Sequence, residues 1–262
     1  MLGYAKVGWN AITKKLVQNE TLALRQLSQQ GLKGIVFPEI LYVGQSSERF
    51  VMVTKPLGRP KARLNKRAFE SKLLQTLTEI ANQDHVVGRF ADSIFWSTIK
   101  SRADRLQGYI SCYERMVLER VLRVLEEHLA DVNLPWTWRL GDVTPWNAWI
   151  DEKGERLFVT DLENATAYWL SGWDFFHFAR MTARSASPEL NVDECLKMIT
   201  QYYSAFGVSS EHLLFLYLAY LVDLFTEWVE DWKNYGEPPG EFDVQTLHKV
   251  ETEILSILTR CL

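Results

Sequence analysis

Two carboxylates and one amide stand beside two short extended runs in the middle of this chain. Asp142 follows the apolar residues 138–140 after one glycine, Asn147 comes five residues later, and Asp161 directly follows the second run, residues 156–160. Carboxylate and amide oxygens are the hard ligands that Mg²⁺ prefers, and Mg²⁺ usually keeps several waters as well. These residue types therefore predict a binding site for a divalent metal ion.

A hairpin between the two runs is the expected way to bring these side chains together. Residues 151–154, Asp-Glu-Lys-Gly, form the kind of polar, glycine-containing segment that closes a hairpin. Because a hairpin returns the chain to its starting end, we expect Asp142, Asn147 and Asp161 to lie close to one another.

The sequence GDVTPWN at residues 141–147, followed by DLE at 161–163, resembles the catalytic loop and metal-binding motif of the aminoglycoside phosphotransferase and choline kinase superfamily. The resemblance implies a protein-kinase-like α+β fold of two lobes: a truncated N-terminal sheet lobe and a larger, mostly helical C-terminal lobe. It also implies an enzyme that phosphorylates a hydroxyl of a small molecule with ATP. It implies that Asp142 accepts the hydroxyl proton, and that Asn147 and Asp161 bind Mg²⁺. The family usually has His two residues before the catalytic Asp, where this chain has Leu140.

An ion pair is predicted near the start of the chain. Residues 3–7 predict a strand, and residues 14–29 predict a helix whose apolar face includes Glu20. Burial of an unpaired carboxylate is costly, so Glu20 needs a partner, and Lys6 on the preceding strand is the natural one. The pair resembles the kinase Lys–Glu pair that orients the nucleotide phosphates. The alternative is that both are ordinary surface charges.

A second hairpin is predicted from residues 39–43 and 49–54, after which the chain leaves the sheet at residues 54–58. In the resembling family this is the hinge between the lobes. The resemblance therefore implies that the adenine of ATP bonds to backbone groups near Thr54 and Leu57.

The expected domains are a partial N-terminal lobe, residues 1–57, and a mostly helical C-terminal lobe with the catalytic hairpin, residues 58–262. The kinase fold normally begins with two strands joined by a glycine-rich loop, and no such loop precedes the Lys6 strand. Two alternatives stay open: the sequence starts late, or the protein lacks the lid over the phosphates.

The C-terminal part has helical periodicity. Helices are predicted at residues 61–81, 109–130, 191–206 and 211–233, with another opening at Trp173 and a last one after Pro238-Pro239. Asp174 resembles the structural Asp that holds the family's catalytic loop through backbone N–H groups; the alternative is a helix-capping acid. His177 is interpreted as structural.

Four acids on the helix predicted at residues 211–233 lie along one side of it, with two tryptophans nearby: Asp223, Glu227, Glu230, Asp231, Trp228 and Trp232. Acids and aromatic rings together could hold a cationic acceptor such as an amino sugar or a choline-like amine. The alternative is that the acids form a solvated face and the tryptophans belong to the core.

The composition of the chain argues against several classes of partner and site. The net charge of −4 argues against a nucleic-acid surface. No signal pattern is visible, and the longest apolar run, residues 213–222, is too short to span a bilayer, so a cytoplasmic protein without a membrane partner is expected. Three widely spaced cysteines suggest neither a disulfide framework nor a CxxC metal site.

The function predicted by this reading is a small-molecule kinase that uses ATP and Mg²⁺ on a hydroxyl of a small metabolite or amino sugar. One alternative is a catalytically silent protein that binds a nucleotide or metabolite. A second is a metal-dependent hydrolase that uses the same acids without ATP and has no role for Lys6.

Overall fold

The computed structural model of the chain describes residues 3–46, 48–58, 66–151, 153–186, 191–235 and 241–261. The chain packs as two compact units, each built from two stretches of sequence. The first unit comprises Met1–Val86 and Trp136–Cys195, and the second comprises Val87–Pro135 and Leu196–Leu262. This division differs from the lobe boundary expected after residue 57, which stays a prediction.

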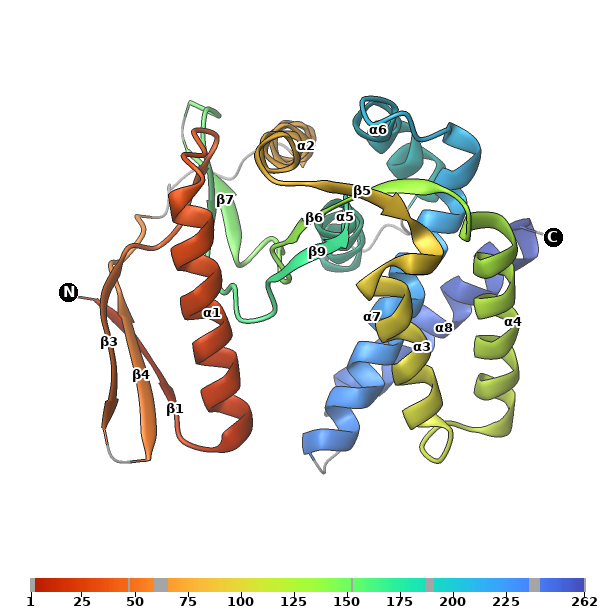
Figure 1. The fold of residues 1–262 in the computed structure, drawn as a ribbon, viewed down its shortest axis with the longest axis horizontal. Helices are drawn as coiled ribbons and strands as arrows, with labels where there is room; N and C mark the ends of the chain where they lie inside the picture. Colours follow the sequence, from red (N-terminus) through yellow and green to blue (C-terminus); the bar gives the residue numbers. More distant parts are fainter. Residues whose placement is uncertain are drawn as a thin grey trace. The chain divides into compact units, whose positions relative to one another are not determined.

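The first unit begins with an antiparallel sheet and one helix. Strands β1 (Tyr4–Gly8), β4 (Arg49–Thr54) and β3 (Ile40–Ser46) pair in the order β1-β4-β3, and α1 (Ala11–Gln29) packs along them (Figure 1). The strand, the helix and the hairpin predicted for this part of the chain are therefore confirmed.

Helix α1 begins three residues before the predicted start at residue 14, because Asn10 and Thr13 cap it. The Asn10 side chain accepts from the backbone N–H of Thr13 at 2.8 Å, and the Thr13 hydroxyl accepts from the Asn10 N–H at 3.2 Å. This reciprocal capping satisfies two N–H groups that the helix leaves open. It lies before the apolar residues on which the predicted start at residue 14 was based.

The hairpin predicted around residues 151–154 is present, but its first strand is not the predicted one. Strand β7 (Ala148–Ile150) pairs antiparallel with β8 (Leu157–Val159), and β2 (Ile35–Val36) adds to β8 in parallel. Trp138 and Arg139 of the predicted run belong instead to the end of β6 (Asn133–Arg139), which pairs with β9 (Thr166–Leu170), and Leu140 follows the strand.

The third sheet has the order β5-β6-β9, with β5 at Val86–Arg89. Helices α2 (Lys66–Gln83) and α5 (Trp173–Ala186) complete the first unit and pack against each other through Phe69 and Phe178, whose rings stack at 4.1 Å. The predicted start of the first of these helices, at residue 61, lies outside the described residues. Helix α6 (Val192–Ser204) follows, capped by Asn191 as its sequence indicates.

The second unit is mostly helical. Besides most of β5 and α6, it contains η1 (Phe90–Asp92), α3 (Ile94–Leu106), α4 (Cys112–Leu129), η2 (Ser210–His212), α7 (Leu213–Tyr235) and α8 (Glu241–Cys261). Helix α7 is central: it packs against α3, α4 and α8 (Figure 1). By length and composition the segment Ser210–Asn234 could span a membrane, although 72% of its apolar window is buried, as in the core helix of a globular unit.

Candidate active site

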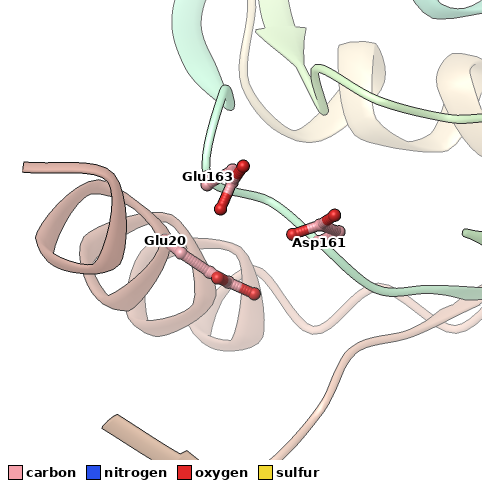
Figure 2. A group of neighbouring side chains, drawn as sticks. All are labelled: Glu20, Asp161 and Glu163. Atoms are coloured by element: carbon pink, nitrogen blue, oxygen red, sulfur yellow. The ribbon is translucent and has the colours of Figure 1, made fainter. Parts of the chain in front are cut away.

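One lysine and three carboxylates form a cluster inside the first unit. The Lys6 Nζ lies 2.6 Å from Glu20 Oε2 and 3.6 Å from Glu163 Oε2, and it also bonds to Asp161 Oδ1. One oxygen from each of the three carboxylates lies within 4.8 Å of the others. Figure 2 shows Glu20 projecting from α1 toward the segment that carries Asp161 and Glu163. The ion pair predicted between Lys6 and Glu20 is therefore present.

The charges of this cluster depend on one another. Burial acts to lower the pKa of Lys6, but the neighbouring carboxylates of Glu20 and Asp161 outweigh it and raise that pKa above its usual value. Burial raises the pKa of Glu20, with Lys6 opposing the shift, and burial also raises the pKa of Glu163, with Asp161 adding to it. The ammonium is thus what allows three carboxylates to lie so close together.

Asp161 is held in an unusual backbone conformation. Its φ of +67° lies in the left-handed region, which is uncommon for residues other than glycine. The segment after it is tied to α1 by Asn19, whose side-chain amide donates to the backbone oxygens of Glu163 at 2.8 Å and Ala165 at 2.9 Å. Strained residues concentrate at functional sites, so this conformation supports a functional role for the Asp161 carboxylate.

The loop that carries Asp142 is closed by its own side chains. The Asn147 Nδ2 donates to Asp142 Oδ2 at 2.5 Å. Gly141 has φ +103°, and a Cβ at this position would come within 2.6 Å of the backbone carbon of Asn164, so only glycine fits without rearrangement. The loop therefore depends on a close approach of the segment that follows the Asp161 motif.

Asp174, at the start of α5, binds the backbone of the same loop. Its two carboxylate oxygens accept from the backbone N–H groups of Leu140 at 2.8 Å and Gly141 at 2.9 Å. The structural role that the resemblance implied for Asp174 is thus present. Burial raises the pKa of Asp174 to about 6, although these two N–H groups and Arg139 act to lower it.

His177, one turn further along α5, touches the Asp142 side chain. Its Nε2 lies 3.4 Å from Asp142 Oδ1, and its ring stacks on Trp173 with centroids 4.7 Å apart. Burial lowers the pKa of His177, although Asp142 acts to raise it. The sequence placed His177 on this helix as a structural residue and held no sign of its contact with Asp142.

The hairpin brings the two predicted metal ligands toward each other. At its open end the backbone N–H of Thr160 donates to the carbonyl oxygen of Asn147 at 2.9 Å, so Asp161 directly follows a residue bonded to Asn147. That Asn147 and Asp161 share one Mg²⁺ stays a prediction. Two further residues of the cluster's surroundings were not predicted. Glu163 belongs to the motif without an implied role there, and Asn19 gives no recognisable signal in the sequence because its partners are backbone atoms far along the chain.

The predicted adenine contacts lie at the end of the first sheet. Thr54 is buried at the end of β4, where it pairs with both Tyr4 and Ile40. Leu57 is half-buried in the segment that follows. Their role toward a nucleotide stays a prediction.

Of the four acids considered on α7, three pair with an arginine of the second unit, contrary to the alternative of a solvated face, whereas Asp231 is exposed. Asp223 is fully buried, and its Oδ1 lies 2.7 Å from the Arg102 guanidinium on α3. Arg102 also lies 3.6 Å from Glu227 and 3.3 Å from Glu230. Sequence spacing on one helix showed the row of acids but not the arginine on another helix that neutralises them.

The sequence matches no family model and no curated protein. Solved structures do match. The choline kinase LicA from Streptococcus pneumoniae is 19% identical, with a TM-score of 0.62 over 96% of this chain and 86% of that chain. A choline/ethanolamine kinase family protein from Mesorhizobium loti is 15% identical, with a TM-score of 0.61 over 92% and 78%. The aminoglycoside phosphotransferase APH(3'')-Id from Streptomyces rimosus, in complex with ADP and streptomycin, is 14% identical, with a TM-score of 0.52 over 84% and 87%.

At these identities the likeness is one of fold. The chain has the protein-kinase-like α+β fold of choline kinases and aminoglycoside phosphotransferases, as the motif at residues 141–147 and 161–163 implied. The fold class expected from the sequence is therefore confirmed.

Proposed function

We propose that this protein is a small-molecule kinase, which transfers the γ-phosphoryl group of ATP to a hydroxyl of a small metabolite or amino sugar. One observation carries the proposal. A single compact unit holds both the Asp142–Asn147 loop and the Lys6–Glu20–Asp161 cluster, joined through the bond between Thr160 N–H and the Asn147 carbonyl.

Each residue has a defined task in this proposal. Asp142 orients the acceptor hydroxyl and takes its proton as the oxygen attacks phosphorus. Lys6, oriented by Glu20, contacts the ATP phosphates. Phosphoryl transfer needs little covalent chemistry from the protein, so positioning and neutralisation of charge supply most of the rate.

The donor set fits a divalent cation. The amide nitrogen of Asn147 is engaged with Asp142, and its amide oxygen is the atom suited to ligate a metal. Asp161 belongs to a group of carboxylates whose oxygens lie within 4.8 Å of one another. We therefore assign Mg²⁺ to Asn147 and Asp161, where it would neutralise charge on the phosphates of ATP.

The substrates named for the matching solved structures suggest a broad class of acceptor to test. Two of them are described as choline or choline/ethanolamine kinases, and a third holds ADP and streptomycin. A small alcohol that also carries an amine is accordingly the first class of acceptor to test, with ATP as the phosphoryl donor.

The test is phosphoryl transfer from labelled ATP, with Mg²⁺, across a panel of amino sugars, amino alcohols and plain sugars. We expect the wild-type protein to phosphorylate at least one of them. Asp142→Asn should keep Mg²⁺-dependent nucleotide binding and lose at least about 10²-fold in turnover, as is typical of a lost general base. Equal turnover in that variant would remove Asp142 from the mechanism.

Two other outcomes correspond to the alternatives raised by the sequence. Tight nucleotide or metabolite binding without transfer, even in a single turnover, would identify a catalytically silent binding protein. Metal-dependent hydrolysis without ATP, unaffected by Lys6→Ala, would identify a hydrolase.

A further inference from the structure

We propose that His177 is a positioning residue for Asp142, holding one oxygen of its carboxylate so that the other faces the reacting hydroxyl. The inference rests on the proposed function, in which Asp142 is the general base. His177 lies on α5, 35 positions after Asp142 in the chain (177 − 142), so the contact exists only in the folded protein.

The start of α5 contacts both the backbone of the loop and its reactive side chain. Asp174 and His177 are three residues apart and therefore share one face of the helix. Asp174 binds the backbone N–H groups of Leu140 and Gly141, and His177 reaches the side chain of the next residue, Asp142. One helix turn thus positions both the backbone of the loop and its reactive carboxylate.

The imidazole ring is itself held firmly. It is only 4% exposed and stacks on Trp173 at an interplanar angle of 20°. The guanidinium of Arg139 lies 3.7 Å from the centre of the same Trp173 ring. A ring packed in this way can fix the direction of its N–H group, as the partners of catalytic and metal-binding side chains do.

The chemistry of the two groups decides which nitrogen carries the proton. A carboxylate can only accept, so the His177 Nε2 that faces Asp142 must be the protonated nitrogen. Burial lowers the pKa of His177, which favours a neutral ring that donates without placing a full positive charge beside the base.

The carboxylate of Asp142 is then held at both oxygens. His177 lies at Oδ1, and Asn147 donates to Oδ2. Each carboxylate oxygen can accept more than one hydrogen bond, so an acceptor hydroxyl can still bind. Leu140 is buried and its side chain carries no polar atom, so it cannot share this task.

The experiment compares two substitutions that separate the N–H donor from the packing. His177→Phe keeps an aromatic ring for the Trp173 stack and removes the donor, whereas His177→Gln keeps a side-chain N–H. We expect His177→Phe to lower kcat about 10- to 100-fold, the usual effect of removing a supporting partner, with little change in KM for ATP or in Tm. His177→Gln should recover most of kcat.

A double variant tests whether His177 acts through Asp142. In an Asp142→Asn background, His177→Phe should cause little further loss, because the group it positions is already gone. Equal losses of kcat in the Phe and Gln variants, accompanied by a lower Tm, would overturn the proposal in favour of a packing role. An undiminished effect in the Asp142→Asn background would also overturn it.

A second readout does not require activity. In the folded protein Asp142 raises the pKa of His177, while burial, Arg139 and Arg180 lower it. An NMR titration of the His177 ring should therefore give a lower pKa in Asp142→Asn than in the wild type, and an unchanged value would overturn the contact. Absence of transfer by the wild type would refute the kinase function alone, leaving the contact to be judged by the titration.

Discussion

Among the described residues, each unit of the molecule contains a cluster of three carboxylates beside basic side chains, and the two clusters differ in exposure and in the cation that they hold. In the first unit Lys6 pairs with Glu20, Asp161 and Glu163. In the second unit Arg102 and Arg105 serve three acids of α7, namely Asp223, Glu227 and Glu230.

The exposure and the chemistry of the cations separate the two. The Arg102 side chain is 13% exposed and its Asp223 partner 0%, whereas Lys6 is 35% and Asp161 36% exposed. A guanidinium has five donors in fixed directions and suits permanent pairing, whereas an ammonium is a compact point charge that another cation can replace. The Arg102 cluster therefore joins α3 to α7, whereas the Lys6 cluster is the one that the proposed function uses.

The largest effect is expected from Asp161→Asn, which tests the functional half of this comparison. Asn tolerates the left-handed conformation well, so the backbone should keep its shape. We expect phosphoryl transfer to fall at least about 10³-fold, as for other groups that stabilise charge in phosphoryl transfer, and Tm to stay near that of the wild type. Transfer and Mg²⁺-dependent nucleotide binding at wild-type levels would contradict the assignment of Asp161.

Asp223→Ala tests the structural half. It leaves the mostly buried Arg102 without its nearest partner, so the free energy of unfolding in urea should fall by about 3 kcal/mol or more. The matched control is Arg105→Ala, whose side chain is 48% exposed and should change that free energy by less than about 1 kcal/mol. A higher KM for the acceptor in folded Asp223→Ala, with little loss of stability, would return Asp223 to the acceptor site.

Lys6→Met should weaken the interaction with ATP and tighten the binding of Mn²⁺. KM for ATP should rise about tenfold or more, because a phosphate contact is lost. Binding of Mn²⁺ in the absence of nucleotide should tighten, because the ammonium no longer occupies the carboxylate cluster. Isothermal titration with Mn²⁺ measures the second effect, and weaker Mn²⁺ binding would show that Lys6 does not compete with a cation there.

The smallest effect concerns Asp174 and pH. Burial raises its folded-state pKa to about 6 from an ordinary value of 3.8. The folded state therefore binds a proton more tightly than the unfolded state, and stability from this group is present below pH 3.8 and lost as pH rises through 6. Relative to Asp174→Asn, the wild type should gain unfolding free energy as pH falls from 6 to 4. The opposite slope would mean that the ionised form is the one favoured by folding.

Much of the first unit was readable from local sequence. The polar turn at residues 151–154, the extended runs on either side of the second hairpin and the apolar face around Glu20 each depend on neighbours a few residues away. The partner of Glu20 could also be inferred, because a carboxylate on an apolar helix face demands a cation and Lys6 lies on the strand just before it.

The pairing of the strands was less accessible. The sequence led us to pair residues 138–140 with residues 156–160. The structure pairs β8 with β7 and gives β6 to β9, a choice that depends on the whole sheet arrangement. Strand pairing depends on packing against cross-strand neighbours more than on local propensity, so the tertiary structure decides it.

The sequence by itself determined the residue types of the candidate site: the carboxylates and the amide of Asp142, Asn147 and Asp161, and a Lys–Glu pair to accompany them. Only the tertiary structure decided which groups support them and which acids are already neutralised. His177 contacts Asp142, Asn19 donates a hydrogen bond to the backbone of Glu163, and Arg102 forms an ion pair with Asp223. The physical reason is that each of these contacts joins residues far apart in the chain, whose approach depends on the packing of whole helices and strands.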